Sequence, residues 1–219
     1  MTEFLRTPAD TPIARLLLAH GAGAAMDSAF LEQMAKLLAE RGIETWRFEF
    51  PYMAARRTGG SKRPPPKAET LLDDFRRAVV ACRATERALP LLIGGKSMGG
   101  RVASMVGDAL HAQGDIAGVA CLGYPFHPPN QPQTWRTAHL VSVAVPLLVV
   151  QGERDPFGTK AEIEGLIDRK EIAASIRFAW IGDGDHDLGP RGASGFTKMG
   201  NLAAAADAML DFARTVTNA

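Results

Sequence analysis

The feature that most constrains the fold is a repeated alternation between short apolar runs and longer amphipathic segments. Apolar, strand-like runs lie at residues 13–19, 43–50, 89–94, 116–123, 143–151 and 174–181. Helical patterns lie at about 28–40, 68–85, from just after 97, 160–170 and 197–215. Strands that are apolar throughout and are separated by helices predict an α/β fold. Its sheet is expected to be mostly parallel, with about six or seven strands and helices on both faces. In such sheets, functional side chains lie at the carboxyl ends of the strands.

The bulk properties of the chain narrow the classes of function. Its 219 residues fit one domain, residues 1–219. The 25 basic and 24 acidic residues give a net charge of +1, so we expect neither nucleic acid nor a membrane as partner. We also expect a cytoplasmic location, because no secretory signal or membrane-spanning run is evident, and we expect a monomer or small homo-oligomer. No zinc-ligand spacing of Cys and His is present, and we expect no metal and no cofactor.

One pentapeptide suggests a nucleophile. The run Gly95-Lys96-Ser97-Met98-Gly99 matches G-x-S-x-G, in which a serine occupies a sharp turn between a strand and a helix. The apolar residues 91–94 precede it and a helical pattern follows from 101, which is the context that the motif requires. The alternative is that Ser97 only caps the helix.

Longer motifs carry a resemblance to a known family. They are 20–23 (HGAG), 48–52 (FEFPY), 94–100 (GGKSMGG) and 151–158 (QGERDPFG). With them the sequence resembles the small, cap-less members of the α/β-hydrolase superfamily, which include dienelactone-hydrolase-like proteins. More narrowly, it resembles the hydrolase-like domain shared by the testis-expressed protein 30 family and a subunit of a histone-acetyltransferase complex. The match extends from about residue 14 onward, and we expect the superfamily's usual first antiparallel strands to be absent or shortened.

Candidates for an acid and a base follow later strands in the order that this fold uses. Asp155 comes directly after an apolar strand, although it could instead form the turn before Pro156. Glu153 is the nearest rival for the acid. His186 is the only one of the five histidines beyond Asp155, and the alternative is a solvated loop histidine.

These roles predict a serine hydrolase. His186 accepts the proton of Ser97, Asp155 orients the imidazole, and a small ester or thioester is cleaved through an acyl-enzyme. The partner is then a small-molecule ester-type substrate. The competing interpretation is a catalytically silent protein-interaction domain. A perhydrolase, a peptidase or a lipase on the same scaffold is a third alternative.

The intermediate of acyl transfer needs an oxyanion hole built from backbone N–H donors. One donor is expected from Met98, the residue after the nucleophile. The other is expected from the loop after the first long strand. By the resemblance, Ala22 is the first choice, with Gly21 and Gly23 behind it. His20 is expected to orient this loop.

Two further segments are candidates for substrate binding. The loop 56–67 carries Arg56 and Arg57 together with Lys62, Arg63 and Lys67 and no acidic residue; it either selects an anionic substrate or is a solvated surface loop. After the fourth apolar run, Tyr124 and Phe126 either line the acyl pocket or only pack the loop. The segment between 123 and 143 is too short for a large lid, which predicts an open site without a large cap domain.

Overall fold

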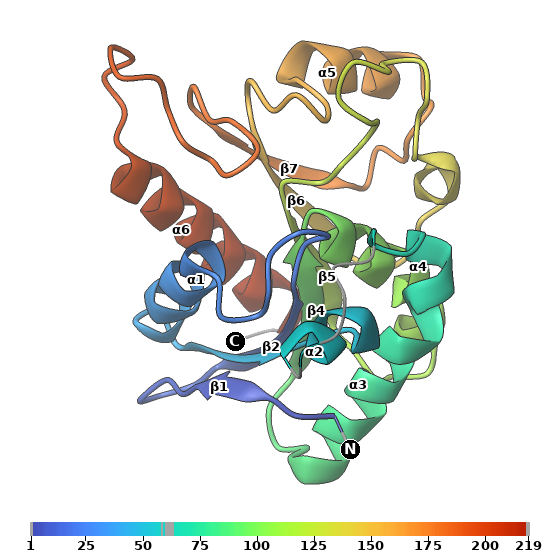
Figure 1. Ribbon diagram of the computed structural model, residues 1–219, viewed down its shortest axis with the longest axis vertical. Helices are drawn as coiled ribbons and strands as arrows, with labels where there is room; N and C mark the ends of the chain where they lie inside the picture. The colour runs from blue at the N-terminus through green and yellow to red at the C-terminus, as the bar shows by residue number, and fades with distance from the viewer. Residues whose placement is uncertain (1, 58, 60–63, 218–219) are drawn as a thin grey trace.

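The computed structural model describes every residue except 1, 58, 60–63, 218 and 219. Its centre is a seven-stranded sheet with the order β1-β3-β2-β4-β5-β6-β7 (Figure 1). The strands are β1 (Leu5–Thr7), β2 (Ala14–Ala19), β3 (Ile43–Phe48), β4 (Leu91–Lys96), β5 (Gly118–Leu122), β6 (Leu147–Gly152) and β7 (Arg177–Ile181). Only β1 runs antiparallel to its neighbour, β3. The mostly parallel sheet is therefore confirmed.

Helices cover both faces of the sheet, as predicted (Figure 1). They are α1 (Ala29–Ala39), α2 (Pro51–Arg57), α3 (Leu72–Thr85), α4 (Met98–Ala112), α5 (Lys160–Asp168) and α6 (Lys198–Thr217), with the short 3-10 helices η1 (Ala68–Leu71) and η2 (Ala138–Val141). Helices α3 and α4 pack on one face, and α1 and α6 pack on the other.

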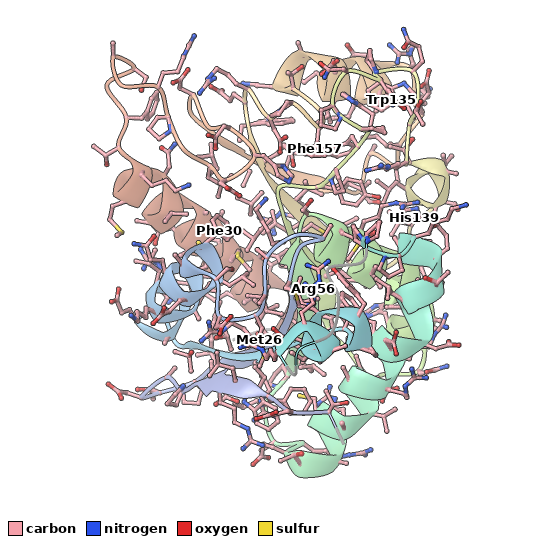
Figure 2. All side chains as sticks on the ribbon, viewed as in Figure 1. Met26, Phe30, Arg56, Trp135, His139 and Phe157 are labelled. Atoms are coloured by element: carbon pink, nitrogen blue, oxygen red, sulfur yellow. The ribbon has the colours of Figure 1, made fainter. Side chains whose placement is uncertain are left out.

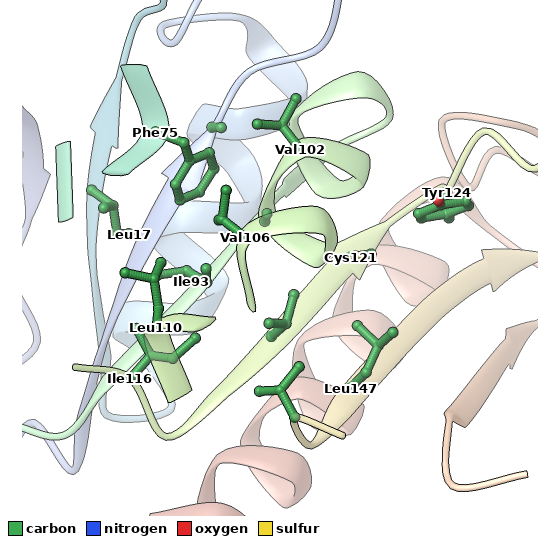
Figure 3. Close-up of a cluster of buried hydrophobic side chains, with 14 of the residues drawn as sticks. Leu17, Phe75, Ile93, Val102, Val106, Leu110, Ile116, Cys121, Tyr124 and Leu147 are labelled. Carbon is green, nitrogen blue, oxygen red and sulfur yellow. The ribbon is translucent and has the colours of Figure 1, made fainter. Parts of the chain in front are cut away.

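The alternation of side chains along each strand explains the two layers. On β2, Leu17 faces the cluster under α3 and α4, which Figure 3 shows in close-up. Its neighbours Leu16 and Leu18 face the cluster under α1 and α6. Because both sides of the strand are buried, β2 is apolar except at Arg15, whose side chain is buried too and forms an ion pair with Glu44. This double burial is the physical reason why the strands were recognisable as apolar runs.

Two local features refine the sequence expectations. The first antiparallel strand is present but short, because β1 pairs with β3 over only three residues. The segment after β3, expected to be a loop, begins with helix α2. Pro51 suits the first position of a helix, where no intrahelical N–H bond is lost, and Ala54 and Ala55 favour the helix after it.

The segment between β5 and β6 contains η2 and no longer helix. No cap domain therefore stands over the carboxyl edge of the sheet, as predicted. Among the described residues, none of the helices has both the length and the apolarity needed to span a bilayer.

Candidate active site

Ser97 occupies a strained turn between β4 and α4. Its φ of 52° and ψ of −118° lie in a region that non-glycine residues rarely adopt, at a cost on the order of 1–3 kcal/mol. The flanking glycines let the strand and the helix approach. A Cβ on Gly95 would lie 2.4 Å from the carbonyl carbon of Gly99, and a Cβ on Gly99 would lie 2.5 Å from the oxygen of His20. The glycine spacing of the motif is therefore sterically required here.

Asp155 and His186 form a hydrogen-bonded pair at the same edge of the sheet. Asp155 Oδ2 lies 2.8 Å from His186 Nδ1, and the Asp155 carboxylate is fully buried. The carboxylate also accepts hydrogen bonds from the Phe157 amide, at 2.8 Å, and from Gln151 Nε2, at 2.9 Å. A carboxylate only accepts hydrogen bonds, so Nδ1 of His186 carries the proton and Nε2 is left as the acceptor.

Contacts on either side of the pair place His186 beside the nucleophile turn. The ring of Phe157 packs on the His186 ring at a centroid distance of 4.2 Å, and Phe157 also lines the pocket that contains Ser97. A Cβ on Gly123 would lie 3.4 Å from His186 Nδ1 and 3.1 Å from Lys96 Nζ. The strand end before Ser97 and the histidine loop therefore converge at Gly123.

Lys96 links this strand end to the histidine loop, a role that the sequence did not suggest. Its Nζ forms an ion pair of 3.2 Å with Asp187 Oδ1, although Lys96 is almost fully buried. Burial lowers the pKa of Lys96, and Asp187 opposes part of that shift. Burial alone raises the pKa of Asp187, but Lys96, together with His186 and Lys198, brings it below its usual value. The pair joins the residue before Ser97 to the residue after His186.

The other two loop aspartates stabilise the histidine loop. Asp185 Oδ1 accepts hydrogen bonds from the amides of Asp187 and Gly189. Asp183 forms ion pairs with Arg154 and Arg191, and its hydrogen bonds with Arg191 lower its pKa to about 2. Among the residues that the structure describes, no group of three or more His, Cys, Asp or Glu side chains is placed to hold a metal ion.

His20 orients the loop that follows β2, as expected. Its Nε2 accepts a hydrogen bond of 3.1 Å from the Phe50 amide, so Nδ1 donates to the Gly21 carbonyl at 2.6 Å. Burial lowers the pKa of His20, which keeps the ring neutral. The Tyr52 hydroxyl donates to the Ala22 carbonyl at 3.0 Å, a second anchor that sequence reasoning missed. The carbonyls of Gly21 and Ala22 therefore point to the side chains of His20 and Tyr52.

The oxyanion-hole candidates lie around Ser97 at different distances. A Cβ on Gly21 would lie 3.7 Å from the Cβ of Ser97. Ala22 and Met98 line the same pocket as Ser97. Met98 is the first residue of α4, where the amide has no intrahelical acceptor. A Cβ on Gly23 would have no neighbour within 4 Å, so this position faces open space.

The pocket at Ser97 has a volume of about 520 Å³. Met98, Ala22, Pro125 and Phe157 contribute to its wall. Charged side chains form another part of it: Lys67, Glu69, Arg101 and Arg136. A further hollow, of about 620 Å³, is lined by Glu49 and Arg57 and contains none of the predicted catalytic residues.

The four remaining substrate-binding candidates lie outside the wall of the Ser97 pocket. Arg57 pairs with Glu49 and Asp27, and these carboxylates raise its pKa. Arg56 lies over the Tyr52 ring, 5.5 Å from its centroid; Figure 2 shows it on α2, apart from Phe157.

Lys62 and Arg63 lie outside the described residues. Tyr124 and Phe126 have no exposed surface, so these side chains pack the loop and do not line the pocket. The reason is that Pro125, between them, takes the pocket-facing position.

Comparison with known proteins identifies the family to which this chain belongs. A family model described as an alpha/beta hydrolase domain matches residues 12–214. The match covers nearly the whole chain, including the strand ends that carry Ser97, Asp155 and His186. The chain therefore belongs to the alpha/beta hydrolase family.

Solved structures agree with that assignment at the level of the fold. An alpha-beta serine hydrolase homologue from Coxiella burnetii is 17% identical, with a TM-score of 0.69 over 96% of this chain and 90% of that one. The dienelactone hydrolase from Anabaena variabilis is 17% identical, with a TM-score of 0.68 over 94% and 88%. A serine hydrolase without a lid from Xanthomonas campestris is 18% identical, with a TM-score of 0.61 over 85% and 86%. The resemblance to cap-less members of the superfamily is thus confirmed.

Proposed function

We propose that this protein is a serine hydrolase that cleaves a small ester or thioester through an acyl-enzyme. Ser97 is the nucleophile, His186 the general base and Asp155 the acid that orients it. The observation that carries the proposal is the hydrogen bond of 2.8 Å between buried Asp155 and His186, beside a serine with φ of 52°. A serine that merely capped α4 would need neither the strained backbone nor the pair.

The mechanism follows from the protonation states that the contacts impose. His186 Nε2 takes the hydroxyl proton as Ser97 Oγ attacks the carbonyl carbon, and Asp155 stabilises the resulting imidazolium. The carbonyl oxygen becomes an oxyanion, which the amide of Met98 and an amide of the His20–Gly23 loop stabilise. The imidazolium then protonates the leaving alcohol or thiol as its bond to carbon breaks. Water, deprotonated by Nε2, releases the acid and restores Ser97.

The shape of the site supports a small substrate that enters from solvent. No cap covers the sheet edge between β5 and β6, and the pocket volume of about 520 Å³ is in the range of small-molecule sites. The structural neighbours whose names include serine hydrolase and dienelactone hydrolase are consistent with this chemistry.

A pair of chromogenic substrates tests the proposal. We expect purified protein to hydrolyse 4-nitrophenyl butyrate or the matching butyryl thioester, and Ser97→Ala to abolish the activity. Ser142→Ala is the matched control, since Ser142 is exposed and lies outside the pocket wall. Equal rates in wild type and Ser97→Ala would contradict the proposal. A folded protein that is inactive on every ester and thioester would favour the silent interaction domain.

A further inference from the structure

The pocket at Ser97 has an excess of positive charge. Its wall includes three cationic side chains, Lys67, Arg101 and Arg136, and a single acidic one, Glu69. These residues come from three separate parts of the chain: η1 and the segment before it, α4, and the loop between β5 and η2. The excess is local, because the whole chain has a net charge of only +1.

Glu69 is already engaged by one of the cations. It forms an ion pair with Arg101 Nη2. A backbone hydrogen bond, and secondly this contact with Arg101, lower the pKa of Glu69. The Arg101 side chain is only 16% exposed, and Arg101 follows Ser97 by one turn of α4, a rise of about 6 Å. Glu69 therefore holds the Arg101 guanidinium in the wall of the pocket that contains Ser97.

Arg136 is held differently. Its side chain is half-buried, and within the described part of the chain no carboxylate forms an ion pair with it. Burial, and secondly the positive charge of Arg101, lower the pKa of Arg136, and the charge of Glu69 opposes a smaller part of that shift. The pocket wall thus keeps an excess of positive charge beside Glu69, and an added anion would stabilise it.

The other polar groups near the two arginines do not supply this anion. His139 hydrogen-bonds to Ser104 at 2.8 Å, and burial, together with Arg101, lowers its pKa to about 4. It is therefore neutral near pH 7. The Tyr124 hydroxyl donates to the Arg136 carbonyl at 3.0 Å, and burial raises its pKa, so it is not an anion either. Tyr124 fixes the backbone of Arg136 instead.

We propose that Arg136, with Arg101 and Lys67, forms a subsite for a carboxylate of the substrate, so that the preferred substrates are esters bearing a carboxylate a few bonds from the scissile group. This inference rests on the proposed function, since it assigns the substrate class of the same site. A guanidinium binds a carboxylate through two parallel N–H···O bonds, which makes Arg136 the selecting residue. Lys67 adds a more exposed point charge at the rim. Of the basic loop 56–67, Lys67 lines this pocket, whereas Arg56 and Arg57 lie outside its wall.

Matched esters test the subsite on both sides of the scissile bond. Mono-4-nitrophenyl glutarate is compared with 4-nitrophenyl butyrate, and 4-acetoxybenzoate with its methyl ester. We expect wild type to prefer the anionic member of at least one pair. Arg136→Gln is expected to lower kcat/KM for that member by about tenfold to a hundredfold while leaving the neutral member nearly unchanged. Arg136→Lys is expected to retain part of the preference.

The control is Arg76→Gln, an arginine on α3 whose side chain is 43% exposed; among the described residues its ion-pair partner is Asp73, and it lies outside the wall of this pocket. Its selectivity is expected to equal that of wild type. Equal losses on neutral and anionic esters in Arg136→Gln, or no preference in wild type, would overturn the subsite while leaving the hydrolase intact.

A binding measurement separates the subsite from catalysis. In Ser97→Ala, calorimetry with glutarate is expected to show binding that Arg136→Gln abolishes. Should no ester be cleaved, the proposed function fails, and this titration alone decides the subsite. Absence of glutarate binding in Ser97→Ala would then refute it. Binding that inorganic phosphate displaces equally well would also contradict a site selective for carboxylates.

Discussion

Replacing Asp155 by asparagine separates charge from shape at the site. The carboxylate accepts hydrogen bonds from the amide of Phe157 on Oδ1, and from Gln151 and His186 on Oδ2. An asparagine keeps one oxygen and turns the other into an NH₂ donor. Whichever way its amide is placed, a donor then faces a donor. Gln151 cannot relieve the conflict, because its own amide is engaged by Tyr124 on both ends.

The two placements predict a range for the loss. With the NH₂ toward His186, Nδ1 must accept, so the proton moves to Nε2 and the base is lost; in serine proteases this exchange costs about 10⁴-fold, or about 5 kcal/mol. With the NH₂ toward Phe157, the active tautomer survives. The unmet backbone donor then costs about 1–3 kcal/mol of folding stability, and catalysis loses the carboxylate charge that stabilises the imidazolium, about tenfold in rate. We therefore expect kcat/KM of Asp155→Asn to fall between about 10- and 10⁴-fold, mostly in kcat.

The assay is ester hydrolysis, with circular dichroism to show that the variant is folded. Glu153→Gln is the matched control: Glu153 follows the same strand, and its oxygens contact the amide of Asp183 and the amine of Lys160. A glutamine keeps the oxygen that Asp183 needs, so a change of less than about twofold is expected. Asp155→Asn with wild-type activity, or Glu153→Gln with the larger loss, would refute the assignment of the acid.

Three other outcomes are expected. Gly95→Ala should yield little soluble, folded protein, because its Cβ would meet backbone atoms at 2.4, 2.6 and 2.8 Å. Gly192→Ala, whose Cβ would have no atom within 4 Å, should melt at the same temperature as wild type. Lys96→Met and Asp187→Asn should each lower kcat, and the double variant should lose less than the sum of the two; additive losses would show that the ion pair does not couple the loops. The free energy of unfolding should fall as the pH drops from 6.5 toward 4, because the unfolded state then protonates His139 while the folded state, with its lowered pKa, resists. His139→Asn should flatten this slope in urea titrations, and an unchanged slope would refute the assignment.

The layers of the fold could be predicted because strands that are buried on both faces consist mainly of apolar residues. Each position of β2 is buried, and all of them except Arg15 are apolar, so the strand can be recognised as an apolar run. Helix α2 has no comparable pattern of apolar residues in the sequence. Of its seven residues only Met53 is buried, so it lacks the apolar period that marks a packed helix.

The site could be predicted only where local rules apply. The glycine spacing around Ser97 and the order of Asp155 and His186 follow from the connectivity of the fold. Arg136 carried no signal, because it joins the pocket through contacts between segments far apart in the chain. The directions of Tyr124 and Phe126 likewise depend on packing that a loop sequence does not encode.

Labelling with a fluorophosphonate probe, followed by peptide mass spectrometry, tests the central claim most directly. The probe reacts with a serine only when a base activates it. We predict one adduct on the peptide that contains Ser97, absent from Ser97→Ala and strongly reduced in His186→Ala. No adduct on the folded protein, or an adduct that persists in Ser97→Ala, would contradict the claim that Ser97 is the nucleophile of a hydrolase.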